Sequence, residues 1–446
     1  MEVLNRVAQA MQTVFTTQAE KAARDSGFCR RKSPLGGPVF VQAMTFACLG
    51  HPLPTLGDFC QAAAAAGAFV QPQSFDDRFG PAACECLRLS LADAVRQVIA
   101  QTPLAGGLLA RFTAVAIQDG STVVLPDCLE GVWRGNGGRT DHNTRSAVKL
   151  QVRLDLRGGR LSGPFLTAGR ASDQACPLQG DDELAPGSLR IADLGYFDLD
   201  EFARLDGKGV YFLSRYQHGT ALFAVLPQPK RLELAEWLAQ QGEGVIDVAV
   251  RIGSRHRLGG RLVAIRVPPE VAQARRERLL ESAKKRGKAV SAGRLKLCGW
   301  TLLLTNIPVG MASAEELEVL RRCRWQIELL FKLWKSGNGL GKSRSDKPHR
   351  VLSEVYAKMI AAVVQHWVLV AGCWEESRRS LTKAAKVVRQ QALSLAAALG
   401  DLGPLLQALA LTVRCLAAGS RTHRSRKDPR TWQLLNLKDH CGVPLS

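Results

Sequence analysis

Three acidic residues stand out by the segments around them: Asp119, Asp193 and Glu328. Asp119 follows a strand-like apolar run, 112–118, and Asp193 follows a second one, 189–192. Glu328 lies in a stretch without Gly or Pro in which apolar residues recur at helical spacing. Carboxylates from two strand ends and a facing helix can converge on a pair of Mg²⁺ ions, because hard divalent cations prefer oxygen ligands. Two such ions stabilise the attacking and leaving oxygens of an in-line phosphoryl displacement.

Each of these carboxylates also has a purely structural explanation. Asp119 precedes a glycine, so residues 119–121 are typical of a turn that leads into a second strand, 122–125. Asp193 can cap the short helix predicted after it, and Glu328 can pair with cations on its own helix. Taken together and in this order, the three acids favour the arrangement of polynucleotidyl transferases with an RNase H-like fold.

The segment 321–335 predicts one amphipathic helix. Its cations fall three or four residues apart and therefore share one face with Glu328: Arg321, Arg324, Lys332 and Lys335. On its own, this pattern favours a solvated helix with ion pairs between successive turns. The three acids and the charge of the chain shift the interpretation toward phosphate binding.

The chain carries a large positive charge that is unevenly distributed. Its 60 Lys and Arg against 40 Asp and Glu leave a net charge of +20 in 446 residues. Between residues 251 and 300 there are 14 basic and 3 acidic residues. A solvated basic surface explains this excess, but a nucleic-acid phosphate backbone as partner is favoured. The predicted helix 271–286 carries cations that we expect to contact the DNA backbone, among them Arg275, Arg276, Lys284 and Lys285.

The spacing of apolar residues changes along the chain and predicts the domain organisation. Residues 1–105 are expected to form a helical DNA-binding domain. Their short helix, glycine turn and second helix with Asp76 suit a helix-turn-helix or a plain helical bundle. Residues 106–350 predict an α/β catalytic domain with an RNase H-like core, interrupted at 216–310 by a β-rich insertion. Residues 351–446 predict a helical C-terminal region with a mobile basic tail from Gly419 to Pro429.

Neither a membrane span nor a secretory signal is expected. No apolar run reaches the roughly 18 residues that a span needs, since Gln365 and His366 interrupt the most apolar segment. Glu2 and Arg6 stand where a signal peptide has its apolar region. The 12 cysteines lack zinc-ligand spacing and are expected to be reduced core thiols. These features predict a cytoplasmic protein.

Three short motifs carry a resemblance to a known family. They are Asp119-Gly-Ser-Thr-Val-Val-Leu-Pro126, Asp193-Leu-Gly-Tyr-Phe197 and Arg324-x3-Glu328-x6-Lys335. In this order, with a basic insertion before the third, they resemble the acidic motifs of the cut-and-paste DDE transposases of the insertion-sequence-four family. The third motif matches that family's Tyr-x2-Arg-x3-Glu-x6-Lys signature, except that Arg321 stands in place of the tyrosine.

The resemblance implies a DNA transposase that cuts phosphodiesters at terminal inverted repeats and transfers the strand into target DNA. The three acids would bind two metal ions, Mg²⁺ with Mn²⁺ as a substitute, and water and then the freed 3′-hydroxyl would attack. Arg324 and Lys335 would hold DNA phosphate, with Arg321 replacing the contact of the missing tyrosine. Because two transposon ends must be cut and joined together, a homodimer on DNA is expected.

Two tryptophans are candidates for holding a base flipped out of the duplex, as in family members that cut through a DNA hairpin. Trp325 adjoins Arg324, and Trp300 ends the basic arm of the predicted insertion. A core position is an equal alternative for Trp300, because a buried strand is predicted at 295–304.

Two other functions stay open at this point. A catalytically inactive descendant of such an enzyme would bind DNA as a repressor, although the presence of all three acids argues against it. An RNase H-like nuclease acting on RNA hybrids or DNA junctions would share the acids, but not the spacing of Arg324 and Lys335.

Overall fold

The computed structural model describes residues 2–31, 33–102, 107–136, 145–181, 183–225, 230–242 and 244–422, together with Trp432 and Leu435. These residues divide into two compact units. The first, called here the helical unit, comprises the described parts of 1–105, 119–172 and 325–433. The second, the strand-rich unit, comprises those of 106–118, 173–324 and 434–446. Strand β1 (Val115–Leu125) contributes residues to both units. Most of the predicted basic tail lies outside the described residues.

Helices from both ends of the chain make up most of the helical unit. The N-terminal ones are α1 (Glu2–Thr13), η1 (Val14–Gln18), α2 (Ala19–Asp25), α3 (Gly37–Gly50), α4 (Leu56–Ala65), α5 (Pro72–Asp76) and α6 (Pro81–Arg96). The later ones are α12 (Trp325–Lys332), η6 (Leu333–Gly337), α13 (Pro348–Cys373), α14 (Leu381–Gln390), α15 (Ala392–Ala398) and α16 (Leu402–Gly419). Between them come η3 (Asp127–Leu129) and the antiparallel strands β2 (Ser146–Asp155) and β3 (Leu161–Ala168). The helical structure predicted for both ends is confirmed in the described residues.

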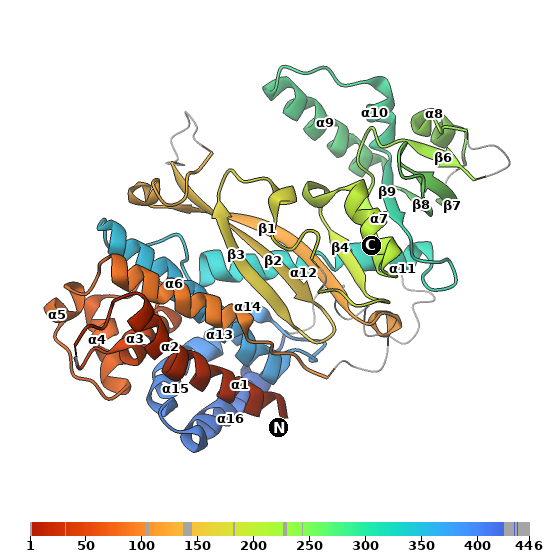
Figure 1. The fold of residues 1–446 in the computed structure, drawn as a ribbon. Coiled ribbons are helices and arrows are strands. Elements are labelled where there is room, and N and C mark those ends of the chain that lie inside the picture. The colour runs from red at the N-terminus through yellow and green to blue at the C-terminus, as the bar shows by residue number, and fades with distance from the viewer. Residues whose placement is uncertain are drawn as a thin grey trace. The chain divides into compact units, whose positions relative to one another are not determined.

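Helix α13 forms the centre of the helical unit. It packs against α1, α3 and α6 from the N-terminal part and against α14 and α16 from the C-terminal part. Figure 1 shows the red and orange N-terminal helices lying among the blue C-terminal ones. Almost every side chain of α13 is buried from Val351 onward. The two ends of the chain therefore share one apolar core.

Two helices, α13 and α16, are long and apolar enough to cross a membrane by length and composition alone, so the expectation that no apolar run reaches that length was wrong. The apolar window of α13 is 89% buried inside the protein, whereas that of α16 is 22% buried. Burial on this scale makes α13 a core helix. Its polar residues have partners there. Gln365 donates to the Ala385 carbonyl, and His366 Nε2 lies 2.7 Å from the Gly159 carbonyl oxygen.

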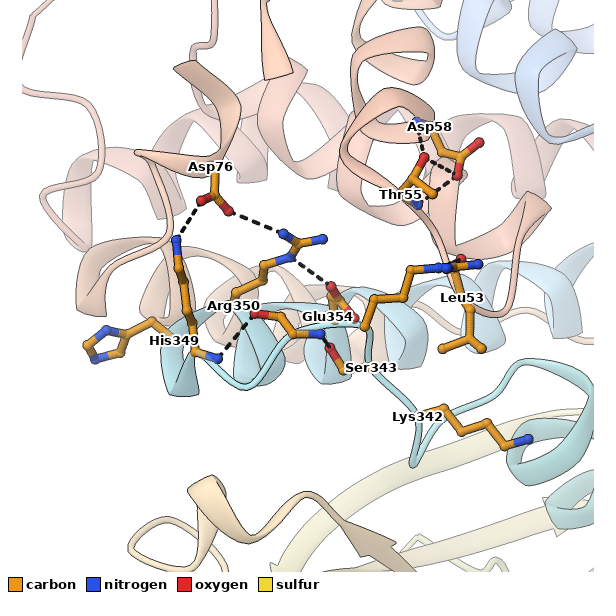
Figure 2. Close-up of polar contacts among 12 residues, drawn as sticks. Leu53, Thr55, Asp58, Asp76, Lys342, Ser343, His349, Arg350 and Glu354 are labelled. Carbon is orange, nitrogen blue, oxygen red and sulfur yellow. Dashed lines mark hydrogen bonds and ion pairs between the residues drawn. The ribbon is translucent and has the colours of Figure 1, made fainter. Parts of the chain in front are cut away.

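An ion network joins α5 to the start of α13. Figure 2 shows the Asp76 carboxylate facing Arg350, whose guanidinium also faces Glu354. Lys347 Nζ lies 2.7 Å from Asp76 Oδ2, and Arg350 Nη1 lies 3.3 Å from Asp76 Oδ1. The side chains of Asp76, Arg350 and Glu354 are 12%, 11% and 1% exposed. Asp76, which lies in the helix that the sequence suited to a helix-turn-helix or a plain helical bundle, links α5 to the start of α13.

The strand-rich unit is built on a mixed sheet. Its elements are η2 (Leu108–Arg111), η4 (Asp173–Ala175), β4 (Leu189–Ala192), η5 (Leu194–Tyr196), α7 (Leu199–Gly207), β5 (Tyr211–Arg215), β6 (Leu222–Ala224), α8 (Leu234–Ala239), β7 (Val245–Ile252), β8 (Leu258–Arg266), α9 (Pro269–Lys285), α10 (Ala292–Leu297), β9 (Trp300–Thr305) and α11 (Ala314–Arg322). Strands β1, β4 and β5 pair in parallel, and β5, β9, β8, β7 and β6 pair antiparallel in that order. The full strand order is β3-β2-β1-β4-β5-β9-β8-β7-β6. The predicted α/β class is confirmed.

Two local predictions for the strands are wrong, and one strand was missed. Strand β1 continues through Asp119 and Gly120 without a turn, because its place between β2 and β4 in the sheet overrides the local Asp-Gly signal. Strand β3, which contains the Gly163-Pro164 pair, was not predicted, since Gly and Pro usually mark a turn. The expected strand 295–304 is divided into the end of α10 and the strand β9.

Replacing Asp76 by Ala is expected to destabilise the protein by about 2–4 kcal/mol, because Arg350 loses a partner in a nearly buried site. The Lys347 ammonium, with Arg350 adding to it, lowers the pKa of Asp76 against the effect of burial. A carboxyl group with a lowered pKa in the folded state stabilises the fold above its unfolded pKa, and this contribution disappears as pH falls through the folded pKa. Urea unfolding of both proteins should therefore differ at pH 7 and converge below about pH 4.

The matched control is Asp77→Ala, which removes an exposed carboxylate that accepts a hydrogen bond only from Gln73 among the described contacts. Its free energy of unfolding should change by less than about 0.5 kcal/mol. Equal unfolding midpoints for the two variants would contradict the assigned role of Asp76.

A second pH dependence is expected from His366. Burial lowers the pKa of His366 from 6.5 to about 4, and its hydrogen bond to the Gly159 carbonyl only partly opposes this. As pH falls below 6.5, the unfolded chain takes up this proton first, so stability should fall by about 1.4 kcal/mol per pH unit down to about pH 4. Denaturant unfolding from pH 7 to pH 4.5 should show this slope in the wild type and a shallower one in His366→Gln. The same pH dependence of the unfolding free energy in both proteins would contradict this role of His366.

Candidate active site

Asp193 follows the last residue of β4 and faces two cations of the strand-rich unit. Its Oδ1 lies 2.8 Å from Arg215 Nη2, at the end of β5. Partial burial alone would raise the pKa of Asp193, but the Leu194 N–H and the charges of Arg215 and Arg324 together lower it. Asp193 does not cap α7, because Asp198 does so by accepting from the Asp200 N–H. The capping explanation for Asp193 is thereby removed, and its carboxylate is held ionised.

The signature segment is not the single helix that was predicted. Helix α11 ends at Arg322, residues 323 and 324 form a turn, and α12 begins at Trp325. The Cys323 N–H bonds both the Val319 and the Leu320 carbonyls, which tightens and ends α11. The proposed common face of Arg321, Arg324, Glu328, Lys332 and Lys335 is therefore not built by one continuous helix.

The two arginines at the end of α11 have different surroundings. Arg321 Nε and Nη2 each lie 2.6 Å from a carboxylate oxygen of Glu318, a buried residue one turn earlier. Arg321 is thus already engaged within its own helix. Arg324 lies in the turn and interacts electrostatically with Asp193.

Asp119 lies inside β1 in the helical unit and is half-buried. Its Oδ1 accepts a hydrogen bond of 2.8 Å from the Gly120 N–H. Lys335, in η6, is close enough to interact with it. Burial lowers the pKa of the Lys335 ammonium, and the negative charge of Asp119 opposes that shift. The structure therefore brings together the first acid and the last cation of the predicted motifs.

The remaining residues of the signature lie in α12. Glu328 is half-buried in its first turn, and Lys332 is exposed at its end. Trp325, the first residue of the helix, is 57% exposed. A large aromatic side chain held in water at a helix start is available for stacking.

Trp300 has the opposite environment. It is 5% exposed and packs in an apolar cluster with Phe212, Leu262 and Leu304, and the Arg266 guanidinium lies 4.8 Å from the centre of its ring. The alternative of a core aromatic therefore describes Trp300 in this structure.

The basic helix α9 contains both engaged and exposed cations. Arg275 donates to the Trp300 carbonyl at 2.9 Å and to Thr301 Oγ1 at 3.2 Å, and burial lowers its pKa. Arg276 donates to the Leu295 carbonyl at 3.4 Å. Lys285 pairs with Glu281 at 2.8 Å, and Lys284 is exposed beside it. The two arginines thus fix α9 against α10 and β9, while the two lysines face solvent.

The pairing of β1 with β4 bears directly on the two aspartates. The parallel register runs from Val115 opposite Leu189 to Gln118 opposite Ala192. These last two residues directly precede Asp119 and Asp193 in the sequence. Within the residues that the structure describes, no group of three or more His, Cys, Asp or Glu side chains could hold a metal ion as it stands.

Arg215 was missed in the sequence, although it contacts Asp193 directly. It ends a strand that pairs in parallel with β4, and polar residues at the carboxyl ends of neighbouring parallel strands are a recognisable signal. That signal becomes readable only once the strand order is known.

A mixed sheet with aspartates beside its parallel strands, in a strongly basic chain, points to enzymes that act on nucleic-acid phosphodiesters. Comparison with known families agrees. Residues 110–364, which are 255 of the 446, match the family model described as Transposase DDE domain, and the chain belongs to this family. Membership implies an RNase H-like core, a DNA substrate and a dependence on divalent metal ions. The chain is therefore a DNA transposase.

Individual relatives support the predicted subgroup. The chain is 26% identical over 379 residues to the transposase for insertion sequence element IS231F of Bacillus thuringiensis subsp. israelensis, covering 81% of this chain and 79% of the relative. It is 25% identical over 374 residues to the transposase for insertion sequence element IS1151 of Clostridium perfringens, covering 79% and 78%. A shorter match, 39% identical over 102 residues, is to the putative transposase InsL for insertion sequence element IS186A of Escherichia coli K12, covering 23% and 28%. The resemblance to the insertion-sequence-four family is confirmed.

The contrast between the two tryptophans predicts opposite effects of truncation. Trp300→Ala should lower the free energy of unfolding by about 3–5 kcal/mol, because it leaves a cavity in a packed cluster. Trp325→Ala should change it by less than about 0.5 kcal/mol, because the side chain is mostly in solvent. Urea unfolding of both variants tests this, and similar losses would show that Trp325 is also structural.

Proposed function

We propose that Asp119, Asp193 and Glu328 are the catalytic carboxylates of this transposase. The observation that carries the proposal is the parallel register that ends at Gln118 and Ala192, directly before the two aspartates. Glu328 belongs to the proposal through its signature spacing to Lys335, which interacts with Asp119.

We infer that the metal ion is Mg²⁺, with Mn²⁺ as a substitute, and that two ions bind. The donor set fits, because all three side chains offer carboxylate oxygens and Mg²⁺ prefers oxygen ligands. When bound, such ions stabilise the charge on the attacking and leaving oxygens. The chain's own contribution is to keep Asp193 ionised through Leu194 N–H, Arg215 and Arg324.

The cations around the carboxylates would hold the scissile strand. Arg324 lies beside Asp193 and Lys335 beside Asp119, so both can neutralise a phosphate presented to these acids. Trp325 would stack on an exposed base, and Lys284, Lys285 and Lys332 would add backbone contacts from the surface. Arg321, Arg275 and Arg276, already engaged within the protein, would support these elements rather than reach DNA.

The proposed oligomeric state and the roles of the three parts of the chain follow from the transposition reaction. Cutting and joining two transposon ends requires two sites, so we propose a homodimer on DNA that acts at the terminal inverted repeats of an insertion sequence in the bacterial cytoplasm. The helical N-terminal part, residues 1–105, would supply DNA binding, residues 106–350 catalysis with the insertion 216–310, and residues 351–446 dimer contacts. The shared core around α13 means that the first and last of these parts fold together.

Conservative replacement of each carboxylate should abolish cleavage without abolishing DNA binding. Asp119→Asn, Asp193→Asn and Glu328→Gln should each reduce Mg²⁺-dependent cleavage of DNA bearing the terminal repeats by at least about 10²–10³-fold. Calorimetric Mg²⁺ titration should show weaker metal binding by the same variants. The matched control is Asp200→Asn, an exposed carboxylate of the strand-rich unit that pairs with Arg255 and His256.

The results also separate the competing functions. Tight binding of the repeats with no cleavage in any divalent metal would identify an inactive DNA-binding descendant. Cleavage of RNA hybrids or four-way junctions, independent of the repeats, would identify a different nuclease. Full activity in any of the three variants would remove that residue from the proposed site.

A further inference from the structure

The helical unit contains a hollow lined by three arginines, far along the sequence from the catalytic motifs. Its volume is about 630 Å³. The lining residues are Glu20, Arg24, Cys29, Arg30, Arg31, Ser33, Pro34 and Gly36. With three guanidinium groups and one carboxylate, the hollow carries a net positive charge. Arg24, Arg30 and Arg31 are all exposed, and none forms an ion pair with another residue that the structure describes.

The chain around the hollow is firmly positioned. Gly27 adopts a positive φ of 70° and ends α2, where its N–H bonds the Arg24 carbonyl. The Phe28 ring is buried, lies 4.4 Å from that of Phe40 and 4.1 Å from the Arg78 guanidinium. Arg78 also donates to the Phe28 carbonyl at 3.0 Å. Arg30 and Arg31 therefore follow closely after a residue, Phe28, that is held in place by its contacts with Phe40 and Arg78.

The second wall of the hollow is the start of α3. An added Cβ at Gly37 would lie 2.3 Å from Ala23 Cβ, so α3 begins in direct contact with α2, which carries Arg24 and Glu20. No side chain caps α3 at Gly36, and its first turn contains no acidic residue. The open N-terminus of a 14-residue helix favours a negative charge at this point. Unpaired arginines and an uncapped helix start thus favour the same ligand, an anion.

We propose that this hollow binds the phosphate backbone of duplex DNA. The inference rests on the DNA substrate of the proposed function and adds a second contact surface, separate in sequence from the carboxylate motifs. Each guanidinium group can donate two hydrogen bonds to phosphate oxygens, and the dipole at an uncapped helix start favours the same negative charge. Contacts of this kind supply affinity and position the protein without reading the base sequence.

The test is the salt dependence of binding to a random-sequence duplex. Arg30→Gln/Arg31→Gln should reduce the slope of log Kd against log salt by about two, roughly one for each lost phosphate contact, and weaken binding at fixed salt by at least about tenfold. The control, Lys386→Gln/Arg414→Gln, removes two exposed cations of the same unit outside the hollow and should leave the slope nearly unchanged. Circular dichroism should show both variants folded, since all four side chains are exposed.

Cys29 provides a second, local readout, because it lines the hollow. DNA should slow its alkylation by N-ethylmaleimide, measured by peptide mass spectrometry, and should not slow that of Cys60, which lies on α4 outside the hollow. The protection should disappear in Arg30→Gln/Arg31→Gln.

A wild-type salt slope in the double variant, with no protection of Cys29 by DNA, would overturn the inference and leave the transposase assignment intact. Protection by polyglutamate but not by DNA would assign the hollow to an acidic protein segment instead, which also overturns it. Failure of the wild-type protein to bind any duplex would count against the proposed function itself.

Discussion

Parallel pairing of β1 with β4 constrains the proposed catalytic site, since both strands lead directly from a paired residue into an aspartate. Successive side chains in a strand point to opposite faces, so a register shift of one residue would turn an aspartate away from its neighbour's face. Two carboxylates in one site repel each other unless cations balance them. Arg215 and Arg324 do so for Asp193, and Lys335 does so for Asp119.

This charge balance links the site to its substrate. Arg324 lies in the turn between α11 and α12, and its charge helps to lower the pKa of Asp193. Arg321, in the last turn of α11, forms an ion pair with Glu318 in the same helix. The arginine retained from the family signature thus acts on Asp193, a proposed catalytic carboxylate, while the residue that departs from the signature pairs within its own helix. The charges that lower the pKa of Asp193 are those of Arg215 and Arg324.

The fold class was predicted correctly from the sequence because it depends on local patterns, whereas the three acids remain a prediction from their motifs. Strand runs and helical spacing are recognised within a few consecutive residues, and the confirmed strand β4 is of this kind. The wrong predictions concern residues whose structure depends on contacts with residues far away in the sequence. The Asp119-Gly120 pair signals a turn locally, but β1 continues through both residues as one strand between β2 and β4 in the sheet. Trp300 could not be assigned from sequence, because its burial depends on strands β5 and β8 folding around it.

Basic composition identified the ligand class but not the residues that contact it. In the segment richest in cations, Arg257 lies over the Phe223 ring, Arg266 over Trp300, and Arg261 pairs with Asp247. Arg261 is buried, whereas Arg257 and Arg266 are exposed and lie over aromatic rings of the same segment. A cation contributes to phosphate affinity only when its charge is not already satisfied inside the protein. The partner of each guanidinium, rather than the local density of positive charge, therefore decides where this transposase can hold DNA.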